Sequence, residues 1–178
     1  MLKEGRLRVV PRPSYEDLYN AQRPRVERLC CLLLADPYEA QDVAQEVLMK
    51  VFRAQQARRP EPTWERWVTR VTVNACRDRH RLAWWRRWRS GSAELREEDL
   101  AASGATPEEA LLTQEVRGHL WAAFRRLSPR QQEVFALRHV EGFSTAEVAE
   151  TLKLSAGSAK CHLFRAVHRL RQALQESP

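Results

Sequence analysis

The sequence predicts an all-α protein made of two small helical domains joined by a flexible linker. Alternating runs rich in Val and Ile, which would indicate strands, are absent, and glycine is scarce, with 6 among 178 residues. Helix start signals, each a Ser or Thr followed three residues later by an acid or an amide, recur along the chain instead. Residues 89–106 are small, polar and acidic, which is typical of a linker between two domains.

The composition allows compact domains and favours a polyanionic partner. The hydrophobic fraction of 43% is enough to form a core in each of two small domains. The net charge is +7, and it is distributed unevenly, because residues 151–175 hold five Lys or Arg and no acid. Positive charge gathered in patches predicts binding to nucleic acid more strongly than the same charge spread evenly.

The first predicted domain, residues 14–88, follows a basic tail over residues 1–13. Ser14 and Asp17 form a capping box, so a helix is expected to start after Ser14. Pro24 should interrupt that helix, because proline lacks the N–H that an internal helical turn needs. We therefore expect a second, separate helix from Pro24 to about residue 34.

The next predicted helix, over about residues 38–54, carries one apolar and one acidic stripe. Its buried stripe is formed by Ala40, Val43, Ala44, Val47, Leu48 and Val51. Glu39, Asp42 and Glu46 lie beside it, within roughly 60° of one another at 100° per residue. On a basic protein, such an acidic patch suits a basic protein partner better than DNA. The alternative is a solvated helix face with a Glu46–Lys50 pair, which would stabilise the helix by only about 0.3 kcal/mol.

A helix expected from about residue 63, with Thr63 as its N-cap, combines aromatic and basic side chains. Residues 64–89 contain five of the six tryptophans and eight arginines, against two acids, Glu65 and Asp78. Indole rings stack on unpaired bases, and guanidinium groups follow a phosphate backbone. This helix is therefore predicted to bind opened, single-stranded nucleic acid.

A helical projection of residues 64–82 separates a core face from a basic face. The predicted core stripe is Trp64, Val68, Val71, Ala75 and Leu82. The opposite, basic stripe is Arg66, Arg70, Arg77 and Arg81. The border between the two stripes is formed by Trp67, Asn74 and Asp78. Trp84, Trp85 and Trp88 crowd the end of the helix and cannot all face one core, so they either stack on bases or contact a partner protein.

The second predicted domain, residues 107–178, contains a helix-turn-helix. Start signals at Thr106, Ser128 and Ser144 introduce successive helices, and a tight turn over residues 153–155 leads into a longer one. The inward residues expected on this longer helix are Ala159, Leu163, Ala166, Val167 and Leu170. This spacing is typical of a helix-turn-helix whose second helix enters a major groove. The alternative is an ordinary helical hairpin with a basic face.

The start of the longer helix supplies the groove-facing candidates. They are Gly157, Ser158, Lys160, Cys161 and Arg165. Their small N-terminal members would let the helix approach base edges closely. Arg165, Arg169 and Arg171 are alternatives for phosphate contacts.

The cysteines do not predict a metal site. Cys30, Cys31, Cys76 and Cys161 form no CxxC pair, and no histidine lies at zinc-finger spacing from two of them. Buried, reduced thiols are the preferred interpretation, with Cys161 set apart by its place on the DNA-facing helix. Direct sensing of redox state or of a metal by these thiols is the alternative.

The sequence also predicts that the chain is not an enzyme. No phosphate-binding glycine-rich loop, HExxH or GxSxG motif is present, and we expect no cofactor and no metal. The longest strongly apolar run, residues 29–35, is too short to cross a bilayer, and no signal peptide is recognisable. A cytoplasmic location is therefore expected.

Three segments resemble the extracytoplasmic-function (ECF) sigma factors of bacterial RNA polymerase, and the resemblance covers nearly the whole chain beyond the tail and the linker. Residues 39–47, EAQDVAQEV, resemble the acidic motif with which the family binds core polymerase. The helix beginning at Trp64 is similar to the family's Trp-led helix, which carries Asn, then Asp, then Arg. Residues 127–152 are similar to the start of its second domain.

The resemblance implies roles for three groups of residues. Core-polymerase binding would fall to Glu39, Asp42, Gln45 and Glu46. Recognition and melting of the minus-10 promoter element would fall to Trp64, Trp67, Arg70, Asn74, Arg77, Asp78 and Arg81. Duplex reading of the minus-35 element would fall to Ser155, Gly157, Ser158, Lys160, Cys161 and Arg165. The resemblance further implies control by an anti-sigma factor, which in this family is often membrane-bound.

The main alternative is a helix-turn-helix regulator of the kind attached to receiver domains, which binds duplex DNA without being a sigma factor. Such a regulator requires alternating strands and helices around an acidic phosphorylation pocket, and residues 1–88 show no such strands. It also leaves the tryptophan cluster without a role. Four positions depart from the residues common in the sigma family, and they affect the promoter sequence that would be read rather than the fold: Ser158, Ala159, Cys161 and His162.

Overall fold

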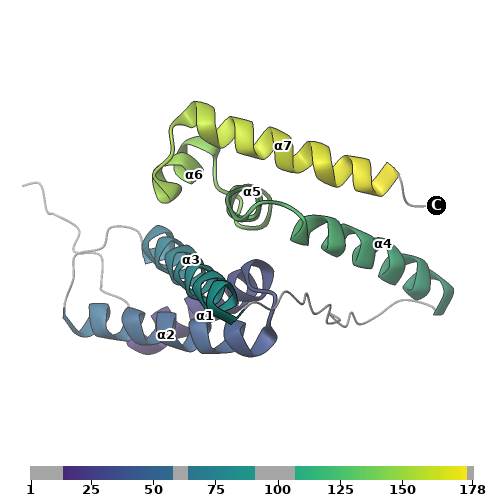
Figure 1. The fold of residues 1–178 in the computed structure, drawn as a ribbon. Helices are drawn as coiled ribbons and strands as arrows, with labels where there is room; N and C mark the ends of the chain where they lie inside the picture. Colours follow the sequence, from purple (N-terminus) through teal and green to yellow (C-terminus); the bar gives the residue numbers. More distant parts are fainter. Residues whose placement is uncertain (1–13, 58–63, 91–106, 176–178) are drawn as a thin grey trace, which may run out of the picture.

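All regular secondary structure in the part of the chain that the structure describes is helical, as predicted. The computed structural model describes residues 14–57, 64–90 and 107–175. Figure 1 shows the helices in two groups, α1–α3 and α4–α7. The predicted basic tail lies outside the described residues, and so does the predicted linker from residue 91 onward. The helix before that linker continues to Ser90.

Three helices form the first domain: α1 (Tyr15–Leu33), α2 (Pro37–Gln56) and α3 (Trp64–Ser90). The predicted capping box of Ser14 and Asp17 begins α1, and the Asp36 carboxylate begins α2 by accepting the backbone N–H of Tyr38 at 2.8 Å. The predicted apolar stripe of α2 is buried along its whole length. It packs with Leu29 of α1 and Val68 of α3, both of which are fully buried.

The predicted helix break at Pro24 is wrong. One helix, α1, continues through Pro24. Pro24 is exposed and removes one backbone hydrogen bond, whereas Leu18, Val26 and Leu29 on either side of it are all buried. The packing of this continuous apolar face outweighs the lost hydrogen bond.

The second domain consists of α4 (Pro107–Arg125), α5 (Pro129–Phe135), the π-helical turn η1 (Ala136–Val140), α6 (Thr145–Leu152) and α7 (Ala156–Gln175). The capping boxes predicted at Ser128 and Ser144 are both present. Lys153 takes a left-handed conformation, with φ 54°, and turns the chain from α6 into α7. On α7, Ala159, Ala166 and Leu170 are buried, while Leu163 and Val167 are half-buried. The predicted helix-turn-helix is confirmed as α6–α7.

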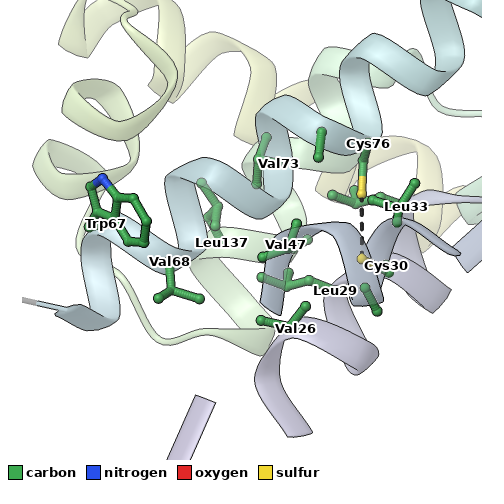
Figure 2. Close-up of a cluster of buried hydrophobic side chains, with 14 of the residues drawn as sticks. Val26, Leu29, Cys30, Leu33, Val47, Trp67, Val68, Val73, Cys76 and Leu137 are labelled. Carbon is green, nitrogen blue, oxygen red and sulfur yellow. Dashed lines mark hydrogen bonds between the residues drawn. The ribbon is translucent and has the colours of Figure 1, made fainter. Parts of the chain in front are cut away.

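The two domains pack against each other, and their cores are continuous. Leu137 of η1 and Val148 of α6 are fully buried in the same cluster as Val68 and Val73 of α3. Figure 2 shows Leu137 among the valines of the first domain. In Figure 1, α5 and α6 lie over α3, while α2 lies on the opposite side of the first domain. The second domain therefore completes the cover of α3.

This packing changes which residues of α3 belong to the core. Leu82, predicted to be in the core, is 54% exposed, because it lies beyond Cys76, the last buried residue described on this helix. Thr69 and Thr72 are fully buried instead, and their hydroxyls donate to the carbonyls four residues earlier at 2.9 and 2.8 Å. Because α3 lies between the α1–α2 pair and the second domain, it is buried on more than the one face that the projection predicts.

The capping box of α6 should make stability pH-dependent through Glu147. A carboxylate oxygen of Glu147 accepts the backbone N–H of Ser144 at 2.8 Å, and this bond lowers the pKa of Glu147 below its ordinary value of 4.5, with smaller contributions from the Ser144 hydroxyl and Arg66. The folded pKa is below the unfolded one, so the stabilisation is present above the unfolded pKa and is lost as the pH falls through the folded pKa.

We expect the free energy of unfolding of Glu147→Gln to depend less on pH than that of the wild type between about pH 5 and pH 3. Urea unfolding at several pH values would measure both slopes. Glu27→Gln is a suitable control, because Glu27 lies outside the capping boxes and pairs with Arg23 on an exposed turn of α1. Equal slopes for Glu147→Gln and the wild type would contradict the prediction.

Candidate nucleic-acid interfaces

The acidic stripe, which consists of Glu39, Asp42 and Glu46, lies on the surface of α2. Asp42 and Glu46 are exposed and Glu39 is half-buried, with the exposed Gln45 beside them. Glu46 accepts a hydrogen bond from Arg79 of α3 at 3.1 Å, which fixes one end of the stripe to the neighbouring helix. Because α2 lies on the side of the first domain opposite the second domain, the stripe is accessible while the domains are in contact (Figure 1).

The predicted minus-10 residues on α3 divide into an aromatic pair and a polar set. Trp67 is 6% exposed and Trp64 is half-buried, with their rings packed edge to face at 5.6 Å between centroids. The exposed members are Arg70, Asn74, Asp78 and Arg81. The polar set is thus accessible to DNA, whereas Trp67, expected on the border, contributes its ring to the core.

Two arginines of the predicted basic stripe contact the second domain. The Arg77 guanidinium donates to both carboxylate oxygens of Glu133 on α5, at 3.0 and 2.8 Å, and this pairing raises the pKa of Arg77. Arg66 forms an ion pair with Glu147 on α6. The side chains of Trp84, Trp85 and Trp88 at the end of α3 lie outside the described residues.

The predicted minus-35 residues gather at the start of α7. The exposed members are Ser155, Gly157, Lys160, Cys161 and Arg165, and Ser158 is half-buried. The Ser155 hydroxyl accepts the backbone N–H of Ser158 at 3.1 Å, which anchors the first turn of the helix. The buried Ala159 holds this turn on the domain core, so the exposed residues are presented on a rigid helix.

Three charged residues at the interface between the domains could not be identified from the sequence. The Glu141 side chain is 0% exposed and lies between Arg25 and Arg28 of α1, at 2.6 and 2.9 Å. Arg125 of α4 donates to the carbonyls of Cys31 and Leu34 at 3.2 and 2.5 Å, and burial lowers its pKa to about 10, which leaves it charged at neutral pH. Glu133, the partner of Arg77, is only 5% exposed.

The exposure of the four thiols differs from the preferred interpretation, which expected buried, reduced thiols with Cys161 set apart. Cys30 and Cys76 are buried and reduced, with their sulfurs 3.9 Å apart, but Cys31 is exposed, like Cys161. The contact with Cys30, together with burial, raises the pKa of Cys76, so its thiol is neutral. Within the described ranges, no three His, Cys, Asp or Glu side chains gather as a metal site requires. Among the same residues, no helix is long and apolar enough to span a bilayer.

The fold and these surfaces define a two-domain all-α protein, with an Arg- and Trp-containing helix, α3, in the first domain and a helix-turn-helix, α6–α7, in the second. Residues 18–86 match the family model for sigma-70 region 2, and residues 117–170 match the model for sigma-70, region 4. The first match covers α2 and most of α1 and α3, and the second covers α5, α6 and most of α7.

Known proteins agree with these matches along most of the chain. The RNA polymerase sigma-E factor of Streptomyces antibioticus is 30% identical over 162 residues, which are 91% of this chain and 85% of that protein. The ECF RNA polymerase sigma factor SigE of Mycolicibacterium smegmatis is 30% identical over 164 residues, which are 91% of this chain and 62% of that protein. The chain therefore spans about three fifths of the length of this relative. The chain belongs to the ECF family of RNA polymerase sigma factors.

A solved structure shares the fold of both domains. The sigma factor RpoE from Bartonella quintana, crystallised with the anti-sigma factor NepR, superposes with a TM-score of 0.74 at 21% identity. The superposition covers 92% of this chain and 98% of that one. The all-α, two-domain architecture is therefore confirmed.

Proposed function

We propose that the chain joins core RNA polymerase and directs it to promoters, with the first domain opening the minus-10 element and the second reading the minus-35 element as duplex. The observation that carries this proposal is the occurrence, in one chain and in order, of matches to sigma-70 regions 2 and 4. A helix-turn-helix regulator of duplex DNA alone would account for the second match and leave the first without a role.

The exposed residues suggest which surface of the protein contacts polymerase and which surfaces contact DNA. The acidic stripe with Gln45 contacts polymerase, and its charge suits a basic protein surface. On α3, Asn74 holds a base that has been flipped out of the stack, while Arg70 and Arg81 contact phosphates. Flipping a base out of the stack costs roughly a few kcal/mol, so a polar group that binds the flipped base is needed. On α7, Lys160 and Arg165 contact the duplex above the short side chains of the first turn.

The proposal includes a protein inhibitor and a cytoplasmic location. The RpoE structure that shares this fold was solved with an anti-sigma factor, and the family relationship supports control of the same kind here. Sigma factors act on chromosomal DNA, which lies in the cytoplasm. The chemistry of RNA synthesis belongs to the polymerase, and this chain contributes no catalytic group to it.

Transcription from a promoter library with purified bacterial core polymerase tests the proposal. We expect transcripts with defined start sites only when the chain is added, and those promoters should share sequence near both minus-35 and minus-10. An Asn74→Ala variant should retain polymerase binding and lose open-complex formation, measured by permanganate reactivity of thymines. Duplex binding without added transcripts would instead favour the helix-turn-helix regulator.

A further inference from the structure

A large aromatic side chain stands in solvent on α7, the second helix of the helix-turn-helix. Phe164 is 71% exposed, whereas Ala159, Ala166 and Leu170 on the same helix are buried against the domain core. Phe164 is not among the residues that the sequence resemblance assigns to the minus-35 element. Single exposed apolar residues are common on protein surfaces, so the neighbours of this ring decide whether it has a partner.

Phe164 lies in the middle of the outer face of α7. At 100° per residue, Cys161, Phe164 and His168 fall within roughly 60° of one another, on the side opposite the buried residues. All three are exposed. Gly157 continues this outer stripe toward the start of the helix without adding a side chain. The stripe therefore contains no lysine, no arginine and no acid.

Cations flank the outer stripe on both sides. Lys160 lies roughly 70° from its centre in one direction and Arg165 roughly 70° in the other, and both are exposed. No Asp or Glu occurs along α7. In the major groove of duplex DNA the base edges lie at the centre and the phosphates along both walls. A helix face with an uncharged centre and two basic edges matches that arrangement.

The ring of Phe164 is supported by its neighbour one turn further along the helix. The ring centroids of Phe164 and His168 are 6.1 Å apart, with 36° between the ring planes. Side chains four residues apart on a helix restrict each other's rotamers. Less conformational entropy is then lost when the ring contacts a ligand.

A phenyl ring can recognise only one feature of a base edge in the major groove. The ring has no hydrogen-bond donor or acceptor, whereas the nitrogen and oxygen atoms of the base edges are all donors or acceptors. The apolar feature there is the C5 methyl group of thymine. Phe164 can therefore distinguish one base from another through that methyl group.

We propose that Phe164 is a specificity-determining residue of the second domain, which contacts the C5 methyl group of a thymine in the minus-35 element while Lys160 and Arg165 contact phosphates on either side. This inference rests on the proposed reading of duplex DNA by α7. Burying one methyl group raises affinity about fourfold. The other possible occupant of this face is a protein, and a protein would bring no dependence on a thymine methyl group.

Replacing thymine by uracil in the DNA removes this methyl group and nothing else. Duplexes are first selected from a randomised pool with the holoenzyme that the chain forms with core polymerase. Each thymine of the enriched minus-35 sequence is then replaced singly by deoxyuridine, and competition anisotropy measures the affinity of the holoenzyme for each duplex. We expect one position at which uracil lowers the affinity of the wild type about fourfold.

Phe164→Ala should lose this discrimination. It should bind the thymine duplex about fourfold more weakly than the wild type does, and it should bind the uracil duplex as well as the thymine duplex. Lys160→Ala is the matched control on the same helix. It should weaken both duplexes equally and keep the fourfold ratio, because a phosphate contact carries no sequence information. Since Phe164 is exposed, the urea unfolding midpoint of Phe164→Ala should match that of the wild type.

The outcomes separate this inference from the proposed function. Equal affinity of the wild type for every thymine duplex and its uracil counterpart would overturn the inference, and so would discrimination retained by Phe164→Ala. An enriched minus-35 sequence without thymine would do the same. In each of these cases the duplex is still read, so the proposed function stands. Absence of any enriched duplex would instead contradict the proposed reading of the minus-35 element, and the inference would fail with it.

Discussion

Asp42→Arg/Glu46→Arg is expected to abolish co-elution of the chain with bacterial core RNA polymerase in gel filtration. Both side chains are exposed on α2, outside the packed core, so the substitutions leave the first domain folded. Two like charges placed against a basic partner surface cost several kcal/mol, which corresponds to a loss of affinity of about 100-fold or more. The loss should be smaller at high salt, where exposed charges are screened.

The matched control for this prediction is Glu16→Arg/Glu27→Arg on α1. It changes the net charge of the chain by the same amount on another exposed face. We expect it to co-elute like the wild type, since total charge alone does not select a docking surface. Equal loss in both variants would show that the interface is not the acidic stripe. Retention of both, with transcription intact, would move polymerase binding to another surface.

The helices of this chain could be predicted because their signals are local. The capping boxes at Ser14, Ser128 and Ser144 are pairs three residues apart, and all three are formed. The apolar stripe of α2 likewise depends only on spacing along one helix. Pro24 shows the limit of such signals, because its effect depends on whether the residues around it are held by other helices.

The interface between the two domains could not be predicted, because its ion pairs join residues that are far apart in the chain. Glu141 and Arg28 are separated by 113 positions, and neither stands out from the residues around it in the sequence. Arg77 has the same sequence signature whether it faces phosphate or Glu133. The exposed residues at the start of α7 were easier to predict, since the turn at Lys153 fixes their orientation locally.

Because Trp67 is buried, substituting it is expected to lower the stability of the protein. Trp67 is 6% exposed and packs edge to face with Trp64, so its ring is part of the first domain's core. Truncating a buried tryptophan to alanine removes its transfer free energy and leaves a cavity, which together cost about 3–5 kcal/mol. We expect Trp67→Ala to lower the free energy of unfolding by that amount in urea, a large fraction of the stability of a small protein.

Asn74→Ala is the matched comparison on the same helix. Asn74 is exposed, so its truncation should change the free energy of unfolding by less than about 0.5 kcal/mol. If it holds a flipped base, the same variant should lose about 1–3 kcal/mol of affinity for a single-stranded minus-10 oligonucleotide. DNA binding by Trp67→Ala must therefore be measured under conditions in which the variant is folded, far from its unfolding midpoint. A stable, folded Trp67→Ala that fails to bind DNA would contradict the core assignment of Trp67 and return its ring to the DNA-binding face.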